Sequence, residues 1–431
     1  MRVALVNPAW SFEGSIYFGC REPHLPLEYG YARALLETAG HEAIVVDAHA
    51  EGLDDCGVRA RLERFAPAMT VVTTAPSYLF WRCAPPELRV PQHLVAAVRE
   101  VAGTLVVVGP HASTTPSATL RKLGADVAVM GECEEVLTTL ASTPRDLWEE
   151  LDSIAYTDGC AVRVRGGPAA CDVSRLPALR WADATVGRHA HHHHRFDRPP
   201  AGPGAEVEAS RGCPYHCAFC AKDEFRNAFR RRSLPTVLAE IDALVAQGVT
   251  YVYFIDEIFL PHRELLEALC ERHVEFGVQM RVDNWTEQQL DLLGRAGCVS
   301  IEAGIESITS EGRSLLAKKC RVTTERLTEL LLHAKKSVPF VQANLIEAGT
   351  DDPEDVARWR DGLRERGVWA NEPVPMFPYP GSPAYVMRWG LPDDHAWERA
   401  HAHYLAEHGA FSDVQDARPA SLAQLELPHA R

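Results

Sequence analysis

The sequence predicts an α/β protein built from two successive parallel β-sheets, each covered by helices. Short apolar runs alternate with helical periodicity through residues 1–150, and the same alternation returns after residue 205. Strands that alternate with helices of this length are typical of β-α-β units. The chain has 431 residues, and single hydrophobic cores stop growing at about 250–300 residues. More than one domain is therefore expected.

Residues 1–150 contain five expected strands in a repeating β-α pattern. The strands are Arg2–Asn7, Glu42–Ala48, Thr70–Thr74, Thr104–Val108 and Ala125–Met130. Helical patterns lie at Leu25–Gly40, which ends in a glycine cap, and at Pro91–Gly103. Ligands of such sheets lie beyond the carboxyl ends of the strands. Those ends carry Asn7-Pro8, Asp47, Ala75-Pro76-Ser77, Gly109-Pro110-His111 and Gly131-Glu132.

Residues 151–204 are expected to form a bridge that consists of a hairpin and a linker. Thr157-Asp158-Gly159 is a turn signal between the short runs Asp152–Tyr156 and Ala161–Arg165. The segment that follows is rich in proline and glycine, which is typical of a linker. It includes the histidine-rich run His189–His194. Histidine runs can bind metals, but no cysteine or carboxylate spacing surrounds this one, and we assign it no role.

The second region, residues 205–385, contains six expected β-α units, and residues 386–431 are expected to form a small helical extension. The strands are Ala205–Ser210, Thr250–Ile255, Gln279–Val282, Val299–Gly304, Val341–Ile346 and Pro373–Phe377. The helical segments include Leu234–Gly248, Thr286–Ala296 and Thr324–Lys335.

Three cysteines, Cys213, Cys217 and Cys220, follow the first of these strands at the spacing C-x3-C-x2-C. One loop can therefore present three thiolates to three corners of a four-iron cluster, which leaves the fourth iron without a protein ligand nearby. A three-thiolate zinc site or a disulfide loop is the alternative. Zinc sites usually pair one C-x2-C element with a second, and this chain has no other C-x2-C element.

The cysteine spacing, with the aromatic Phe219 before the last cysteine, resembles that of the radical S-adenosylmethionine (SAM) superfamily. The resemblance implies a [4Fe-4S] cluster whose free iron chelates the amino and carboxylate groups of SAM. One electron from the cluster would then break a sulfonium C–S bond and release a carbon radical. The resemblance also implies that residues 205–385 form a partial (β/α)6 barrel of the TIM type, with its chemistry at the carboxyl ends of the strands.

The same resemblance assigns contacts with SAM to residues at three of these strand ends. Asp256 and Glu257 match the acidic motif that receives the SAM amino group, since a carboxylate pairs with an ammonium by charge-assisted hydrogen bonds. Arg281 would pair with the SAM carboxylate or with the substrate. Asn344 stands where the family often has a glycine-rich adenine motif, which is degenerate here.

The fourth strand end resembles the ribose-binding element of the family. It carries Glu302 and then Glu306-Ser307. Carboxylate and hydroxyl groups of this kind exchange hydrogen bonds with sugar hydroxyls. Pro378–Tyr385 resembles the segment that closes many cobalamin radical SAM domains.

The N-terminal region resembles the cobalamin-binding domain, a Rossmann-like fold, that precedes many radical SAM domains. Its landmarks are Asn7-Pro8, Gly40-His41-Glu42, Gly109-Pro110-His111 and Met130–Glu134. Asp47–Gly52 also spells D-x-H-x-x-G, the axial-histidine motif of other cobalamin proteins. In those proteins the histidine follows strand one, whereas His49 follows strand two, so we expect no ligation by His49. The domain either binds cobalamin through shape alone or has kept the fold without the cofactor.

The resemblance implies a transferase that acts on a small molecule with SAM, and it leaves the reaction open. With cobalamin, family members often methylate an unreactive carbon or phosphorus. An alternative is transfer of the 3-amino-3-carboxypropyl group of SAM to arsenite, as in the arsinothricin biosynthetic enzymes. That group has a cysteine-rich C-terminal element, whereas this chain has no cysteine after Cys320. An iron–sulfur redox sensor is an alternative of another class, and a sensor would not need acidic strand ends that cradle SAM.

The composition indicates which partners and compartment to expect. A net charge of -15 and a pI near 5.7 argue against a nucleic-acid binder, because phosphate backbones are held mainly by lysine and arginine. The apolar run before Pro8 is too short for a signal peptide, and no run reaches the roughly 18 apolar residues of a membrane helix. Twelve cysteines without a paired framework favour a reducing compartment, so we expect a cytoplasmic protein.

One basic run and the remaining cysteines leave further alternatives open. The run Arg226–Arg232 contains four arginines, which suit either a solvated helix start or a dock for an acidic electron donor such as flavodoxin or ferredoxin. Cys270 and Cys298 fall on apolar positions and are expected in the core. Four cysteines near loops or element ends are candidates to hold a soft atom: Cys20, Cys83, Cys133 and Cys320.

Overall fold

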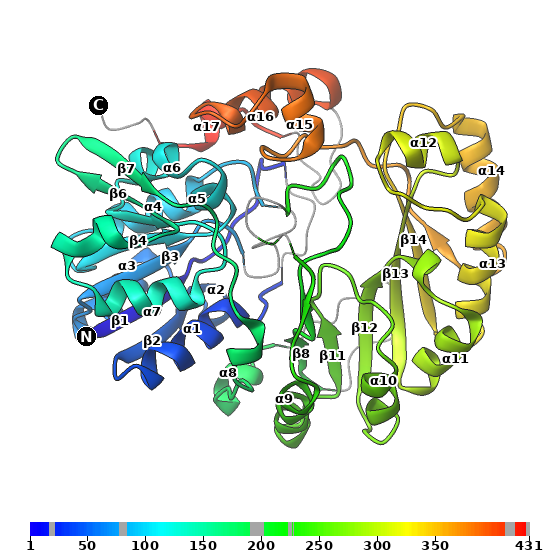
Figure 1. Ribbon diagram of the computed structural model, residues 1–431, viewed down its shortest axis with the longest axis horizontal. Coiled ribbons are helices and arrows are strands. Elements are labelled where there is room, and N and C mark those ends of the chain that lie inside the picture. Colours follow the sequence, from blue (N-terminus) through cyan, green and yellow to red (C-terminus); the bar gives the residue numbers. More distant parts are fainter. Residues whose placement is uncertain are drawn as a thin grey trace. The chain divides into compact units, whose positions relative to one another are not determined.

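The computed structural model of the chain divides into two compact units, which we call the N-terminal unit and the barrel unit (Figure 1). The N-terminal unit comprises Met1–Trp181, Ala221–Asn227 and Phe377–Arg431, and the barrel unit comprises Ala182–Cys220 and Ala228–Met376. The structure describes residues 1–16, 22–76, 84–189, 202–222, 226, 228–409 and 419–427. Among these residues, no helix is long and apolar enough to cross a membrane.

The N-terminal unit contains a seven-stranded sheet in the order β2-β1-β3-β4-β5-β6-β7. The first five strands are parallel, as the β-α repetition predicts: β1 (Arg2–Asn7), β2 (Glu42–Asp47), β3 (Met69–Thr73), β4 (Thr104–Val108) and β5 (Val127–Val129). The connecting helices are α1 (Leu27–Thr38), α2 (Ala48–Glu51), α3 (Asp55–Phe65), α4 (Arg89–Val98), α5 (Pro110–Thr114), α6 (Pro116–Leu123) and α7 (Glu134–Ser142), followed by the 3-10 turns η2 (Arg145–Glu150) and η3 (Val173–Arg175).

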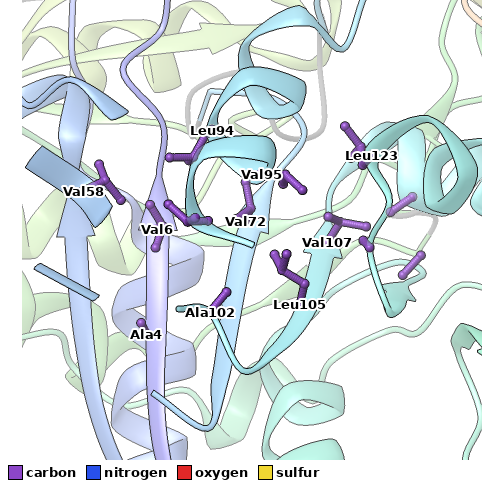
Figure 2. Close-up of a cluster of buried hydrophobic side chains, with 14 of the residues drawn as sticks. Ala4, Val6, Val58, Val72, Leu94, Val95, Ala102, Leu105, Val107 and Leu123 are labelled. Carbon is purple, nitrogen blue, oxygen red and sulfur yellow. The ribbon is translucent and has the colours of Figure 1, made fainter. Parts of the chain in front are cut away.

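Buried valines of the sheet pack against one layer of these helices (Figure 2). Val6, Val72 and Val107 come from β1, β3 and β4, and Val58 and Leu94 come from α3 and α4. Burying each such side chain stabilises the fold by about 1.5–3 kcal/mol. A parallel sheet covered on its faces in this way accounts for the β-branched runs from which the strands were predicted.

The predicted bridge, residues 151–204, does not form a separate segment, because its hairpin belongs to the N-terminal sheet. The hairpin strands are β6 (Ile154–Asp158) and β7 (Ala161–Arg165). β6 pairs antiparallel with β5 and so extends the sheet at its edge. The sequence signal identifies the hairpin turn, but the pairing with β5 depends on a long-range contact. The later part of the bridge, residues 190–201, with most of the histidine-rich run, lies outside the described residues.

The C-terminal extension also belongs to the N-terminal unit, and it begins at Phe377 rather than at residue 386. Its helices are α15 (Pro383–Trp389), α16 (Ala396–His408) and α17 (Leu422–Leu425). Phe377, Tyr385 and Tyr404 form a buried cluster with Ile16 of the N-terminal segment. The ammonium group of Lys122 on α6 pairs with Glu398 at 2.7 Å and with Glu426 at 2.8 Å. These contacts attach the extension to α6, next to which Figure 1 draws it in orange and red.

The barrel unit contains six parallel strands in the order β15-β14-β13-β12-β11-β8, as the six predicted β-α units require. They are β8 (Gly204–Val207), β11 (Tyr251–Phe254), β12 (Glu275–Met280), β13 (Cys298–Glu306), β14 (Phe340–Leu345) and β15 (Trp369–Ala370). The order has two ends, so the described strands form an open barrel. The sixth strand lies before the predicted Pro373–Phe377, of which only Val374 forms an isolated bridge with Ile346.

Helices accompany the strands of the barrel unit, and Figure 1 draws α11, α13 and α14 along one side of them. They are α8 (Asp183–Val186), α9 (Leu234–Ala246), α10 (Arg263–Leu269), η5 (Val282–Asn284), α11 (Glu287–Arg295), α12 (Ser310–Leu315), α13 (Thr324–Ala334) and α14 (Pro353–Arg364). A short antiparallel pair, β9 (Ser210–Arg211) and β10 (Arg230–Arg231), brackets the cysteine loop.

The basic run is neither a solvated helix start nor a uniformly exposed patch. Arg232 is 3% exposed, and its guanidinium pairs with Glu240 at 2.9 Å. Arg226 is 1% exposed and lies 3.9 Å from Glu132 in the N-terminal unit. Arg230 lies in β10 and is partly buried. Two of the four arginines are therefore enclosed in the protein and paired with carboxylates, because a buried charge requires a partner.

Candidate active site

The cysteine loop begins immediately after β9, at a glycine that no other residue replaces easily. Gly212 has a φ of +75°, and a Cβ atom built on it would lie 2.1 Å from the carbonyl oxygen of Ala228. Glycine alone combines this backbone conformation with so close an approach. Cys213, Cys217 and Cys220 follow, all partly exposed and none in a disulfide. The amide of Cys220 donates to the carbonyl of Cys217 at 3.1 Å, which turns the loop back on itself.

The donor set of this loop fits a four-iron cluster. Three partly exposed thiols within eight residues suit three iron corners, because iron–sulfur clusters are held by thiolates. Burial, reinforced by the nearby Glu306 carboxylate, raises the pKa of Cys217 to about 11, while Lys318 and Arg281 act in the opposite direction. Iron must therefore displace a proton from Cys217 when the cluster assembles. Phe219 lies between the second and third cysteines and is also partly exposed.

Asp256 and Glu257 lie after β11, where the sequence predicts them, but both carboxylates hold the entrance of the cysteine loop. Asp256 is 1% exposed and accepts hydrogen bonds from the Ala209 amide, at 2.9 Å, and from the Ser210 hydroxyl. Glu257 accepts from the Gly212 amide at 2.7 Å. The acidic pair thus fixes the three residues that lead into the loop. Contacts with the SAM amino group remain a prediction for both side chains.

The burial of Asp256 makes stability depend on pH. Burial, together with the like charges of Glu208 and Glu257, raises the pKa of Asp256 from 3.8 to about 7. Between about pH 4 and pH 7 the folded protein keeps this proton while the unfolded chain loses it, so stability falls as pH rises. We expect Asp256→Asn to remove this fall, which between pH 5 and pH 8 is about 2–3 kcal/mol, because about two of the three pKa units lie above pH 5. Urea unfolding at pH 5 and pH 8 measures it.

The control for this prediction is Asp242→Asn. The guanidinium of Arg272 lowers the pKa of Asp242, which therefore stays ionised between pH 5 and pH 8. Its replacement should leave the difference in unfolding free energy between the two pH values unchanged. If Asp256→Asn also left that difference unchanged, the protonation of Asp256 in the folded state would be refuted.

Arg281 directly follows β12 and connects three parts of the site. Its guanidinium forms a two-point ion pair with Asp283, with contacts of 3.2 and 2.8 Å. It also donates to the carbonyl of Lys318 at 2.6 Å and lies 3.9 Å from the centre of the Tyr215 ring in the cysteine loop. The Tyr215 hydroxyl donates to Asn284 at 2.6 Å. Arg281 is therefore committed to protein partners, and its pairing with a SAM carboxylate stays a prediction.

The two residues predicted at the end of β13 behave differently from each other. Glu306 has a left-handed φ of 63°, and its carboxylate contacts the ammonium group of Lys318. Ser307 is fully buried, and its hydroxyl donates to Asp351 at 2.7 Å. Asp351 also accepts from Thr309, so Ser307 belongs to a network that closes the following loop. We find no exposed hydroxyl at Ser307 for a ribose to contact.

Glu302 and Asn344 lie on the partly exposed face of the barrel sheet. In register across three strands, Gln279 of β12 is next to Glu302 of β13, which is next to Gln342 of β14. Asn344 lies two residues after Gln342 on β14, and its side chain accepts a hydrogen bond from the Gln342 amide at 2.5 Å. All four side chains are partly exposed, whereas their sequence neighbours are mostly buried. This alternation gives the face a row of carboxylate and amide groups that suits a polar ligand.

The family of the second region follows from a comparison with family profiles. The profile of the radical SAM superfamily matches residues 207–359. These residues run from the end of β8 into α14 and include the cysteine loop.

The chain contains a radical SAM domain. It is an enzyme that uses SAM, and its radical SAM domain uses a [4Fe-4S] cluster.

Whole-chain comparisons find similar proteins beyond this radical SAM domain. An uncharacterized methyltransferase of Pyrococcus horikoshii is 24% identical over 349 residues, which are 78% of this chain and 72% of the relative. The radical SAM methyltransferase TsrM of Kitasatospora setae, solved with cobalamin and a [4Fe-4S] cluster, is 20% identical, with a TM-score of 0.66 over 99% of this chain and 81% of TsrM. The cobalamin-dependent radical SAM enzyme OxsB is 15% identical, with a TM-score of 0.67 over 95% of this chain and 67% of OxsB. The two structural matches establish a shared fold.

The D-x-H-x-x-G segment of the N-terminal unit has a local structural explanation. Asp47 accepts from the Ala50 amide at 3.2 Å and so caps the short helix α2. Gly52 ends that helix with a φ of 63°. Asp47 also accepts from Asn7 at 2.9 Å across the ends of β1 and β2. Helix capping therefore accounts for the aspartate and the glycine of the motif without a bound cobalt.

The carboxyl ends of β3 and β4 lie under the C-terminal extension. Trp397 of α16 packs against Ala75, which follows β3, and stacks on His111 with ring centres 4.1 Å apart. Burial lowers the pKa of His111 to about 3, so its ring is neutral. The neighbouring Thr74 and Ala75 are small and fully buried. The main-chain groups bond within the unit, because the Thr74 amide donates to Val108 and the amide and carbonyl of Ala75 bond with the Thr73 hydroxyl.

The remaining predicted residues have mixed outcomes. Cys298 is buried as expected, whereas Cys270 is exposed at the end of α10, so its assignment to the core is wrong. Cys133 is buried at the start of α7, and Cys320 is partly exposed. Cys20, Cys83 and Ser77 lie outside the described residues, as do residues 190–194. Sequence reasoning missed Tyr215, Asp283 and Lys318, whose roles depend on contacts between distant segments.

Proposed function

We propose that the protein is a cobalamin-dependent radical SAM methyltransferase that acts on a small molecule. The observation that carries this proposal is the combination of a three-thiol loop at the first strand of an open parallel barrel with an N-terminal β2-β1-β3-β4-β5 sheet in one chain. The similarity to TsrM extends over 99% of the chain and so includes the C-terminal extension. TsrM was solved with cobalamin bound, which indicates that a fold with such an extension accommodates the cofactor.

In this proposal Cys213, Cys217 and Cys220 hold the cluster, and the acidic residues after β11 fix the loop that carries them. The cluster supplies an electron to SAM, and cobalamin supplies a carrier for the methyl group. Asp256 and Glu257 act mainly through their hydrogen bonds with the chain before Cys213. The Glu257 carboxylate, close to the loop, would also favour the SAM ammonium group.

The polar row on the barrel sheet is the proposed binding surface for the adenosine part of SAM or for the substrate. Glu302 lies between two amide side chains and near Asn344, in register across the strands. Its carboxylate can accept hydrogen bonds from hydroxyl or amino groups, and the flanking amides can donate or accept. A neutral or cationic small molecule suits this surface better than an anionic one, because the row contains no cationic side chain.

Cobalamin is proposed to bind at the carboxyl ends of the N-terminal strands. This placement is supported by the similarity to TsrM, which was solved with cobalamin bound, and by the rule that ligands of parallel sheets lie beyond the carboxyl ends of the strands. His49 lies in α2, which follows the edge strand β2, and His111 is stacked on Trp397, so no imidazole is assigned to the cobalt. We therefore expect cobalamin to be held without a protein imidazole ligand.

The test needs no knowledge of the methyl acceptor. Anaerobically reconstituted, reduced protein loaded with hydroxocobalamin is mixed with SAM, and S-adenosylhomocysteine is measured by mass spectrometry. We expect about one equivalent per chain with cobalamin and none without it, because methyl donation leaves S-adenosylhomocysteine behind. After desalting, the protein should also keep the visible spectrum of cobalamin. A colourless desalted protein that forms no S-adenosylhomocysteine would refute the proposal.

The Cys217→Ala variant is the matched control for this experiment. It removes one thiolate of the barrel unit and leaves the N-terminal unit unchanged, so it should retain cobalamin after desalting. Loss of cobalamin from this variant would contradict the assignment of the cofactor to the N-terminal unit.

Transfer to arsenite and a redox sensor are alternatives that gain no support from the comparisons. We further propose a cytoplasmic location, because a reduced cluster and unpaired cysteines favour a reducing compartment. A flavodoxin or ferredoxin remains the proposed electron donor. The buried ion pairs of Arg226 and Arg232 leave Arg230 and Arg231 as the members of the basic run for such a contact.

A further inference from the structure

Three non-glycine residues of the barrel unit have left-handed backbone conformations close to the cysteine loop in the fold. They are Glu306, Ala317 and Lys319, with φ values of 63°, 50° and 53°. Such conformations are unfavourable for residues with a Cβ atom and persist only where the surrounding structure holds them. Two of them flank Lys318, and the third supplies the carboxylate that Lys318 contacts. The three unfavourable backbone conformations therefore all lie at or next to the two residues of one ion pair.

Lys318 is held in place through its neighbours, its main chain and its side chain. The carbonyl of Leu316 accepts from the amide of Ala218 in the cysteine loop at 2.8 Å. The carbonyl of Lys318 accepts from Arg281 at 2.6 Å. Its side chain is 1% exposed and ends at the Glu306 carboxylate. The segment from residue 316 to residue 318 is thus attached directly to the loop that carries the cysteines.

Gly304 creates the space that brings the Glu306 carboxylate to this position. A Cβ atom at Gly304 would lie 2.4 Å from a carboxylate oxygen of Glu306. The left-handed turn at Glu306 directs its side chain back over Gly304, and the amide of Ile346 holds the Glu306 carbonyl at 2.8 Å. The sequence Gly304-Ile305-Glu306 therefore serves to place one carboxylate against Lys318.

The ion pair lies within electrostatic reach of a proposed cluster ligand. Lys318 lies two residues after Leu316, whose carbonyl accepts from the amide of Ala218 next to Cys217, and it forms an ion pair with the oppositely charged Glu306. Charges in a buried environment interact more strongly than charges in water, because the effective dielectric constant is lower. A cluster bound to Cys217 would experience the same two opposing charges. The reduced cluster carries one more negative charge than the oxidised cluster, so each charge favours a different redox state.

We propose that Lys318 and Glu306 are positioning residues that set the reduction potential of the cluster. The Lys318 ammonium group stabilises the reduced state, and the Glu306 carboxylate opposes it. Hydrogen bonds, charge and burial around a cluster are the means by which proteins adjust its potential. The proposal rests on the cluster of the radical SAM domain alone, so it stands or falls independently of cobalamin and methyl transfer.

The experiment is a redox titration of anaerobically reconstituted full-length protein, followed by electron paramagnetic resonance. At the wild-type midpoint, Lys318→Met should lower the ratio of reduced to oxidised cluster about tenfold, or about 59 mV for one electron. Lys318→Arg should stay close to wild type, because the charge remains. Glu306→Gln should raise the ratio, and the double variant Glu306→Gln/Lys318→Met should return it towards wild type.

The pattern of signs separates an electrostatic role from a structural one. Lys336→Met, which removes an exposed lysine of the same unit, is the control and should not change the midpoint. If both single variants moved the midpoint in the same direction, or if neither moved it, the proposal would be overturned. If Lys318→Met did not assemble a cluster, Glu306→Gln would decide alone: a raised ratio supports the proposal, and an unchanged ratio overturns it.

Discussion

Cys217→Ala should lose the cluster and with it the cleavage of SAM. Cys217 is the second of the three cysteines, and its carbonyl accepts from the Cys220 amide at 3.1 Å. Two thiolates cannot replace three at a four-iron cluster. We expect iron content to fall to background and SAM cleavage under reducing, anaerobic conditions to fall by more than about a hundredfold, which corresponds to a barrier higher by about 3 kcal/mol.

Cys270→Ala is the matched control for this prediction. Cys270 is an exposed, free cysteine in the same unit, and its loss should change neither iron content nor SAM cleavage. Iron determination, the visible absorbance of the cluster and mass spectrometry of SAM products measure both variants. Persistent cleavage in Cys217→Ala would show that this thiol is not a cluster ligand.

Gly212→Ala should also impair assembly of the cluster, although it removes no thiolate. The new methyl group would lie 2.1 Å from the carbonyl oxygen of Ala228, and the φ of +75° would be strained. The backbone must shift, and the Gly212 amide would then lose its hydrogen bond with Glu257. Because the cysteine loop begins at the next residue, the positions of the three thiols relative to the barrel would change. We expect iron content to fall by more than about half and stability to fall by about 1–3 kcal/mol.

Gly248→Ala separates the effect of the close contact from the effect of the backbone conformation. Gly248 has a φ of +89°, but no atom lies within 4 Å of the position of an added Cβ. This variant should lose about 1 kcal/mol from strain alone and keep its full iron content. Thermal unfolding and iron determination distinguish the two variants. Equal iron contents in Gly212→Ala and wild type would contradict the role assigned to the tight turn.

Local patterns in the sequence predict most of the strands and the cysteine loop. Arg2–Asn7 and Thr104–Val108 of the N-terminal sheet match the structure at both ends, and the first five barrel strands are placed within about four residues. These elements can be predicted because apolar runs and glycine caps are patterns within a single segment of the chain. The two-residue strand β15 carries too little pattern to locate, so the sixth strand was placed too late.

Contacts between distant segments could not be read from the sequence. The hairpin β6–β7 and the C-terminal extension join the N-terminal unit through pairing and packing that involve residues far apart in the chain. The same holds at the site. Arg281 is recognisable as a strand-end arginine, but its partners Tyr215 and Lys318 are 66 and 37 residues away along the sequence. Ser307 occupies a position of the predicted ribose-binding element, but its hydroxyl donates to Asp351 in the network that closes the following loop.

The most direct test of the central claim is the identity of the products that the protein forms from SAM. Reconstituted, dithionite-reduced protein loaded with cobalamin is incubated with SAM without oxygen, and the products are identified by mass spectrometry. We expect S-adenosylhomocysteine from methyl donation, together with 5'-deoxyadenosine where reductive cleavage occurs, and no 5'-deoxyadenosine from Cys217→Ala. Methylthioadenosine as the main product, or no product from protein with a full cluster, would contradict that claim.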